Sequence, residues 1–319
     1  MEKDDSFLHA NYNDRTSVLE KTKNVSLIRR FFKGSIEFDY ENNFFNSRRE
    51  LKPPQFELTN KYGIFFSIKG GSSAITTIFK EYGLSDLNIT TNKIYGRYIS
   101  SKIGFKQDIL IDELVKPIEE ILNGKSKKDL IIVIRNPVYK FLSGLYQDVS
   151  FELQSSDVLL GIVSNKYDVK YNHKDNDDKI KSLNDSAICF LAYNLLKYRL
   201  SSGQDVASSH SDLYNEFYYS LLTNNNIDSS KLKIVDIDDP NSDLIKCLGE
   251  YNPEIIDSSN NRGYWTHRGH HEMLLNGIEK LCLEDNNFEL LKAVKSEINN
   301  DFHYYTLIRQ NYKDNVYIK

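Results

Sequence analysis

The chain has 319 residues and a formal net charge of −4 at pH 7; 40% of its residues are hydrophobic and 27% are charged. This balance is that of an ordinary globular protein and excludes a wholly disordered chain. The acidic charge argues against general nucleic-acid binding, although it leaves room for a local basic pocket. No apolar run approaches the roughly 18–20 residues of a membrane-spanning helix, so we expect no membrane span.

Cysteine content and the first residues of the chain indicate its cellular setting. Cys189, Cys247 and Cys282 are too few and too scattered for a disulfide framework or a zinc site. The opening Met-Glu-Lys-Asp-Asp-Ser is acidic and lacks the apolar core of a signal peptide. We therefore expect a soluble, cytoplasmic protein.

A polar arm is expected before the folded domain. Residues 1–55 are polar and irregular, with one amphipathic helix predicted at about residues 16–33. Pro53 and Pro54 end this arm, because neither has an amide hydrogen to donate. Residues 56–319 are then expected to form a single α/β domain.

Two strand-to-helix units follow the arm. Residues 62–68 form a short apolar run typical of a buried strand. Residues 129–134, Asp-Leu-Ile-Ile-Val-Ile, form the clearest central strand. Asn136 then caps a helix whose first turn contains Pro137.

Alternating strands and helices predict the fold class. They imply an α/β protein with a P-loop-like, mainly parallel central sheet, helices on both faces and a helical C-terminal part. The polar stretch at residues 165–185 is expected to be a surface loop. Helices are predicted over residues 74–82, 108–122, 138–148, 185–200, 213–224, 272–282 and 288–311, and a further strand over residues 232–236.

The first strand-to-helix turn carries a lysine, two glycines and two hydroxyls, in the segment Lys69-Gly-Gly-Ser-Ser73. Glycines let the backbone approach an anion closely, amides at a helix start donate to it, and Lys69 adds positive charge. The order differs from a Walker A loop, in which the lysine follows the second glycine. The pattern favours a phosphate cradle; the alternative is a glycine-rich turn with a solvated lysine.

The second turn places Arg135 at the end of a strand and Ser143 eight residues later. Arginine offers a bidentate clamp for a phosphate, and a serine hydroxyl adds a hydrogen bond. The alternative is a surface arginine and a helix serine that packs against the sheet.

Together, the two turns resemble the donor-binding motifs of sulfotransferases that use 3′-phosphoadenosine-5′-phosphosulfate (PAPS). Phe65-Phe-Ser-Ile-Lys-Gly-Gly-Ser-Ser73 is similar to their 5′-phosphosulfate loop. Ile132-Val-Ile-Arg-Asn-Pro-Val-Tyr-Lys-Phe-Leu-Ser-Gly-Leu-Tyr146 is similar to their 3′-phosphate motif. The likeness is greatest to carbohydrate enzymes of the heparan 2-O, chondroitin and HNK-1 types. Asn299-Asn-Asp-Phe-His-Tyr-Tyr305 resembles their closing helix more weakly.

The resemblance implies a sulfotransferase fold and roles for individual residues. Lys69 would neutralise the leaving phosphate oxygen, and Arg135 and Ser143 would bind the 3′-phosphate. The 5′-phosphosulfate would be held by Lys69, Gly70, Gly71, Ser72 and Ser73.

A late loop, Arg262-Gly-Tyr-Trp-Thr-His-Arg-Gly269, has the chemistry of the element that covers the adenosine in this family. The resemblance implies a further 3′-phosphate contact for Arg268, with Tyr264 and Trp265 over the base. The alternative is a plain basic surface turn.

The general base is where the sequence departs from these relatives. The 2-O type has a histidine after a His-Gly pair, where this chain has Tyr95-Gly-Arg97, and arginine cannot act as a base at neutral pH. His210, just before a predicted helix, is the candidate base. The alternative is a loop histidine without a chemical role, and Glu81 and Glu113 are the next candidates.

The expected activity is in-line transfer of a sulfuryl group from PAPS to a hydroxyl acceptor, expected to be a glycan. The resemblance implies no metal, and His267, His270 and His271 lack acidic or cysteine partners at ligand spacing. Animal relatives carry a Golgi membrane anchor, and its absence here favours a bacterial or viral origin. Two alternatives stay open: a non-catalytic protein that binds nucleotide or glycan and, less favoured, a P-loop-like kinase.

Overall fold

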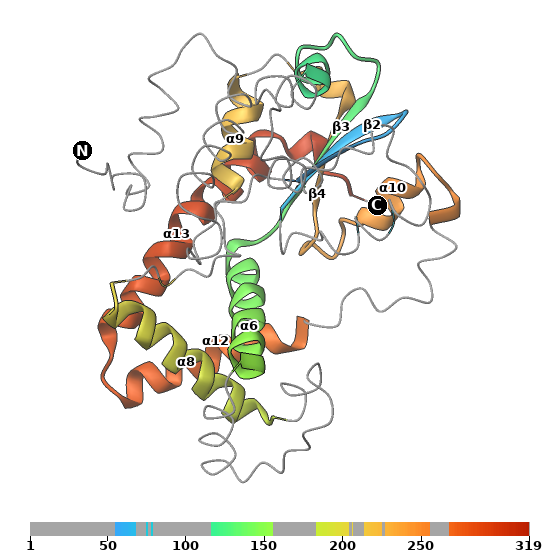
Figure 1. Ribbon diagram of the computed structural model, residues 1–319. Helices are drawn as coiled ribbons and strands as arrows, with labels where there is room; N and C mark the ends of the chain where they lie inside the picture. Colours follow the sequence, from blue (N-terminus) through green and yellow to red (C-terminus); the bar gives the residue numbers. More distant parts are fainter. Residues whose placement is uncertain are drawn as a thin grey trace, which may run out of the picture.

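A computed structural model describes residues 55–67, 75, 78, 116–155, 183–203, 206, 214–224, 227–255 and 268–318 (Figure 1). The predicted arm before residue 55, with its helix, lies outside these residues. So do most of the helix predicted at residues 74–82 and the polar stretch up to residue 182.

Within the described residues, four strands form one mixed sheet: β1 (Gln55–Leu58), β2 (Tyr62–Phe66), β3 (Asp129–Ile134) and β4 (Leu232–Asp236), in that order. The strands β2, β3 and β4 run parallel, as the sequence predicts. The edge strand β1 was not predicted, and it pairs antiparallel with β2. A turn over residues 59–61 joins them, and so short a connection permits only antiparallel pairing.

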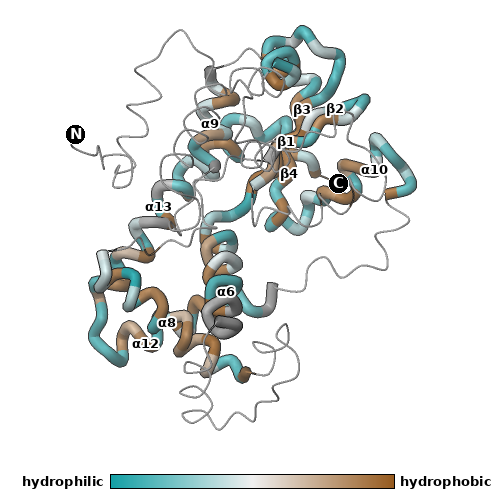
Figure 2. Tube along the Cα trace, viewed as in Figure 1, coloured by the Kyte–Doolittle hydropathy of each residue, from teal (hydrophilic) through white to brown (hydrophobic). Residues whose placement is uncertain are grey.

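Side chains of the strands alternate between two buried faces of the sheet. Phe65 and Ile132 point to one face, and Ile64 and Val133 point to the other. None of these four side chains is more than 1% exposed. In Figure 2 the strands are accordingly among the most hydrophobic parts of the chain. Burial on both faces explains why β2 and β3 are nearly continuous apolar runs in the sequence.

Helices cover both faces. The face of Phe65 is covered by α9 (Tyr214–Asn224), by the second half of α13 (Phe288–Asn311) and by the helical residues 116–122. The opposite face is covered by α10 (Leu244–Gly249), which was not predicted. The α/β class is therefore confirmed.

A second core lies below the sheet in Figure 1, where α6 (Pro137–Ser155), α8 (Asp185–Ser201) and α12 (Arg268–Glu284) pack together. We call this group the helical body. The last two α-helices, α12 and α13, confirm the predicted helical C-terminal part.

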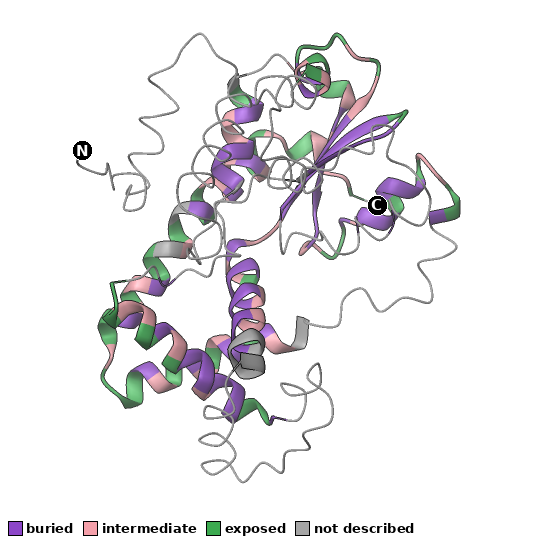
Figure 3. Cartoon of the chain, viewed as in Figure 1, coloured by how far each residue is buried: buried purple, intermediate pink, exposed green. Residues whose placement is uncertain are grey.

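The helix α13 belongs to both cores. Leu290 and Val294, near its start, pack in the helical body, whereas Tyr305 and Ile308 pack against the sheet. Its 24 residues span about 36 Å at 1.5 Å per residue, which is enough to cross from one core to the other. Figure 3 shows buried segments of α13 alternating with exposed ones along this path.

Most predicted helix bounds lie within a few residues of the observed ones. The bounds of α13 coincide with the prediction, and α8 and α9 differ from it by one residue. The helix α6 runs to Ser155, beyond the predicted end at residue 148, and Val149 is still part of its buried face. No helix among the described residues is long and apolar enough to cross a membrane.

The last described residues lie along β4. After α13, the short 3-10 helix η5 (Lys313–Asn315) turns the chain back toward the sheet. Val316 then forms an isolated parallel bridge with Ile234, and the amide of Tyr317 donates to the Ile234 carbonyl at 2.8 Å. A second 3-10 helix, η4 (Ser229–Lys231), directly precedes β4.

Candidate functional site

The carboxyl edge of the parallel strands carries the candidate site. β2 and β3 are adjacent and parallel, with Phe65 opposite Ile132, so both strands end at the same edge. Arg135 follows β3 there, and the sequence after Ser67 leaves β2 there. In open α/β sheets this edge is where ligands bind.

The start of α6 lies beside Arg135. Asn136 caps the helix, because its Oδ1 accepts a hydrogen bond from the amide of Val138 at 3.0 Å. The predicted cap is thereby confirmed. Helix N-termini carry a partial positive charge that favours anions. Ser143 lies half-buried in the second turn of this 19-residue helix.

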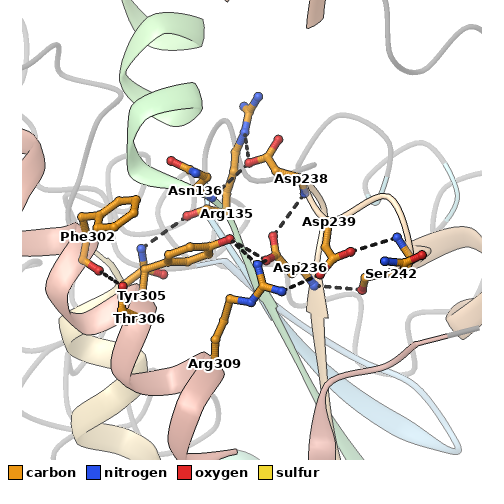
Figure 4. Close-up of polar contacts among 12 residues, drawn as sticks. Arg135, Asn136, Asp236, Asp238, Asp239, Ser242, Phe302, Tyr305, Thr306 and Arg309 are labelled. Carbon is orange, nitrogen blue, oxygen red and sulfur yellow. Dashed lines mark hydrogen bonds and ion pairs between the residues drawn. The ribbon is translucent and has the colours of Figure 1, made fainter. Parts of the chain in front are cut away.

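Arg135 forms an ion pair with Asp238, which follows β4. Nε of Arg135 donates to Oδ2 of Asp238 at 3.3 Å, and the two side chains are 11% and 6% exposed. The same oxygen accepts from the amide of Asn136 at 3.0 Å. One carboxylate oxygen therefore holds both the arginine side chain and the backbone that leads into α6 (Figure 4).

Asp236 lies beneath Asp238 at the end of β4. The amide of Asp238 donates to Oδ1 of Asp236 at 3.2 Å. Oδ2 of Asp236 accepts from the hydroxyl of Tyr305 at 2.6 Å and lies 3.1 Å from Nη1 of Arg309. Burial raises the pKa of Asp236, and the bond from Tyr305 and the charge of Arg309 partly offset that rise. Arg309 also pairs with Asp239.

The backbone of Arg135 has a second support. Its carbonyl accepts from Nδ2 of Asn215 at 3.4 Å, and Asn215 also donates its amide and its Nδ2 to Asp301, at 3.1 and 2.7 Å. Asp301 is 1% exposed. Burial raises its pKa, the charge of Lys140 and the bonds from Asn215 lower it, and Glu216 raises it, so that the pKa lies at about 6.

The helix α13 therefore faces the site with a polar stripe. Asp301, Tyr305 and Arg309 are spaced four residues apart, so they lie on one side of the helix. Asp301 binds Asn215, which donates to the Arg135 carbonyl. Tyr305 and Arg309 bind Asp236, which accepts from the amide of Asp238, the ion-pair partner of Arg135.

The first turn of α12 lies against α6. The ring of His271 stacks on Tyr139 with 5.5 Å between centroids, and Tyr139 lies four residues after Arg135. Arg268 begins α12 three residues before His271. The start of α12, where Arg268 lies, is therefore beside α6, the helix that follows Arg135.

Several predicted site residues lie outside the described residues, and for them the sequence predictions stand as predictions. For Arg268 the backbone is described and the side chain is not. The others are Lys69, Gly70, Gly71, Ser72, Ser73, Glu81, Glu113, His210, Tyr264 and Trp265.

The acidic residues after β4 were not singled out by the sequence analysis. The segment Asp236-Ile-Asp-Asp-Pro240 begins at the last residue of a short buried strand. Acidic side chains at the carboxyl end of a parallel strand can be identified from the sequence as candidate site residues, because ligands bind at that edge of the sheet. Asn215 and Asp301 gave no such signal, because each lies within a helix.

Among the described residues, no group of three or more acidic, histidine or cysteine side chains is arranged to hold a metal ion. No protein-family model, curated protein or solved structure matches the chain.

Proposed function

We propose that this protein is a PAPS-dependent sulfotransferase that acts on a hydroxyl group, most simply that of a carbohydrate. The position of Arg135 carries the proposal. It follows the central strand β3, precedes the N-terminus of α6, and lies at the edge where the chain leaves β2 toward Lys69-Gly-Gly-Ser-Ser73. To bind the 3′-phosphate and the 5′-phosphosulfate of one PAPS molecule, the two motifs would need to lie at the same edge of the sheet.

In the proposed reaction the protein binds PAPS through its two phosphate-bearing ends. Arg135 and Ser143 bind the 3′-phosphate, which distinguishes PAPS from ATP. Arg268 adds a further contact to the same group, and the start of α6 adds a favourable partial charge.

The chemical step is a single displacement at sulfur. The acceptor oxygen attacks the sulfur in line, the bond from sulfur to the 5′-phosphate oxygen breaks, and His210 takes the hydroxyl proton. Lys69 stabilises the negative charge that develops on the leaving phosphate.

Calorimetry on the full chain tests the donor site. Adenosine 3′,5′-bisphosphate should bind clearly, and AMP and ATP much more weakly. Arg135→Ala should lose about 1.5–3 kcal/mol of bisphosphate binding, the usual scale for hydrogen bonds to charged groups. Arg199→Ala is the matched control, because Arg199 forms a comparable part-buried pair with Asp148, at 2.8 Å, in the helical body. Equal affinity for AMP and the bisphosphate would contradict the assignment.

A turnover assay tests the reaction itself. Labelled PAPS should transfer its sulfuryl group to glycan acceptors in preference to phenols and peptides, with chelator present. Bisphosphate binding without turnover on any acceptor would favour a non-catalytic binding protein. Turnover of ATP with a strict Mg²⁺ requirement would favour a kinase.

A further inference from the structure

The contact between Asp238 and Arg135 affects the binding of an anion in two ways. A carboxylate beside an arginine lowers the positive potential that attracts an anion. It also fixes the guanidinium, and a side chain that is already fixed loses less conformational freedom when a ligand binds. These two effects change anion affinity in opposite directions.

Asp238 itself is held in place. Its backbone amide donates to Asp236, a carboxylate with no exposed surface that Tyr305 and Arg309 hold in turn. Its Oδ2 joins Arg135 and the amide of Asn136. The Asp238 carboxylate thus binds Arg135 and the start of α6, while the Asp238 backbone is linked through Asp236 to β4 and α13 (Figure 4).

Fixing the guanidinium matters most where recognition is directional. The arginine fork matches phosphate oxygens in a planar, bidentate way, so its orientation decides how many hydrogen bonds it can make. A misoriented guanidinium still attracts negative charge, but it does so without selecting where a phosphate sits.

We infer that Asp238 is a positioning residue, which holds the Arg135 guanidinium in the orientation that recognises a second phosphate on an adenosine nucleotide. The inference rests on the proposed function. It assigns the selectivity for 3′-phosphorylated donors to the Asp238–Arg135 pair and not to Arg135 alone.

The test compares two dissociation constants for each full-length variant, one for AMP and one for adenosine 3′,5′-bisphosphate. Their ratio measures selectivity for the 3′-phosphate and is insensitive to a fraction of unfolded protein. Asp238→Ala should lower this ratio by about tenfold or more, the scale of one charge-assisted hydrogen bond. Asp238→Asn keeps an acceptor oxygen and should stay within about threefold of the native ratio.

Asp148→Ala is the control variant. It removes the acid of the Arg199–Asp148 pair, which joins α8 to α6 in the helical body and in which Asp148 is 8% exposed. Its ratio should equal that of the native protein, even if its melting temperature falls.

The outcomes separate the inference from the proposed function. A native protein that prefers the bisphosphate, with an unchanged ratio in Asp238→Ala, overturns the positioning role and leaves the proposed function standing. A ratio that rises in both Asp238 variants also overturns it, because charge balance then dominates. A native protein without any preference for the bisphosphate overturns both. If Asp238→Ala fails to fold, Asp238→Ser replaces it, because serine lacks the carboxylate that holds Nε of Arg135 and the same fall in the ratio is expected.

Discussion

The hydroxyl of Tyr305 donates a 2.6 Å hydrogen bond to Oδ2 of Asp236, a carboxylate with no exposed surface. Nη1 of Arg309 reaches the same oxygen at 3.1 Å and the Tyr305 hydroxyl at 3.2 Å. Three side chains from β4 and α13 thus share one buried negative charge. A buried charge is tolerated only when such partners compensate it.

Removing the hydroxyl should therefore destabilise the protein. Tyr305→Phe leaves Asp236 with one partner fewer on that oxygen, and we expect a loss of about 1.5–3 kcal/mol in the free energy of unfolding. Urea unfolding measures this loss. Tyr198→Phe serves as the control, because Tyr198 is 59% exposed and the change should be near zero. Equal stabilities of the two variants would contradict the role given to Tyr305.

The buried carboxyl of Asp301 should make stability depend on pH. Its pKa is raised from 3.8 to about 6, chiefly by burial, so the folded protein holds this proton more tightly than the unfolded chain does. The stabilisation from this group is complete below about pH 4 and is lost as the pH rises through about 6.

Asp301→Asn removes this titration. The stability of the native protein relative to the variant should fall by up to about 3 kcal/mol between pH 4 and pH 7. Urea unfolding at both pH values measures the difference. Asp314→Asn, at an exposed position of η5, should show no comparable change. A relative stability of native and Asp301→Asn that is constant, or that increases with pH, would contradict this prediction.

Gly277 of α12 packs directly against Cys189 of α8. A Cβ at this position would lie 2.2 Å from Sγ and 2.7 Å from Cβ of Cys189. Alanine gains up to about 1 kcal/mol over glycine inside a helix. Overpacking in a tight core costs about 1–3 kcal/mol, so it should prevail here.

We expect Gly277→Ala to lower the free energy of unfolding, as measured by denaturant titration. Asn276→Ala, at an exposed neighbouring position of α12, should be neutral or slightly stabilising, since nothing crowds its side chain. A Gly277→Ala variant as stable as the native protein would show that Cys189 can move aside.

The proposed general base gives a kinetic prediction. His210→Ala should lower turnover by about 10²–10⁴-fold, the usual contribution of a general base, and the acid limb of the pH–rate profile should disappear. Donor affinity, measured by calorimetry, should barely change. Near-native turnover on a verified acceptor would remove His210 from the mechanism and direct the test to Glu81 and Glu113.

The parts of the fold that the sequence predicts are those with a local signal. The strands β2 and β3 stand out because burial on both faces makes them nearly continuous apolar runs, and β4 keeps a shorter apolar core of Leu232, Ile234 and Val235. The start of α6 is readable because Asn136 and Pro137 favour a helix start on their own. The strand β1 carries no comparable signal, since its pairing depends on the hairpin that joins it to β2.

The polar contacts of the candidate site have no local signal at all. Arg135 and Asp238 are 103 residues apart in the sequence, and Asn215 and Asp301 are 86 apart. Each pair forms only after the sheet and α13 have brought its members together. The sequence therefore predicted the arginine and its place at the strand end, but not the acid that holds it.

The tail that follows α13 has a consequence for association between molecules. Of the strands that the structure describes, β4 lies at an edge of the sheet, and edge strands present backbone groups with which another chain can pair. Val316 and Tyr317 occupy the middle of that edge, at Ile234. A strand from a neighbouring molecule would have to displace Val316 and Tyr317 before it could pair with β4. The tail therefore hinders edge-to-edge aggregation through β4.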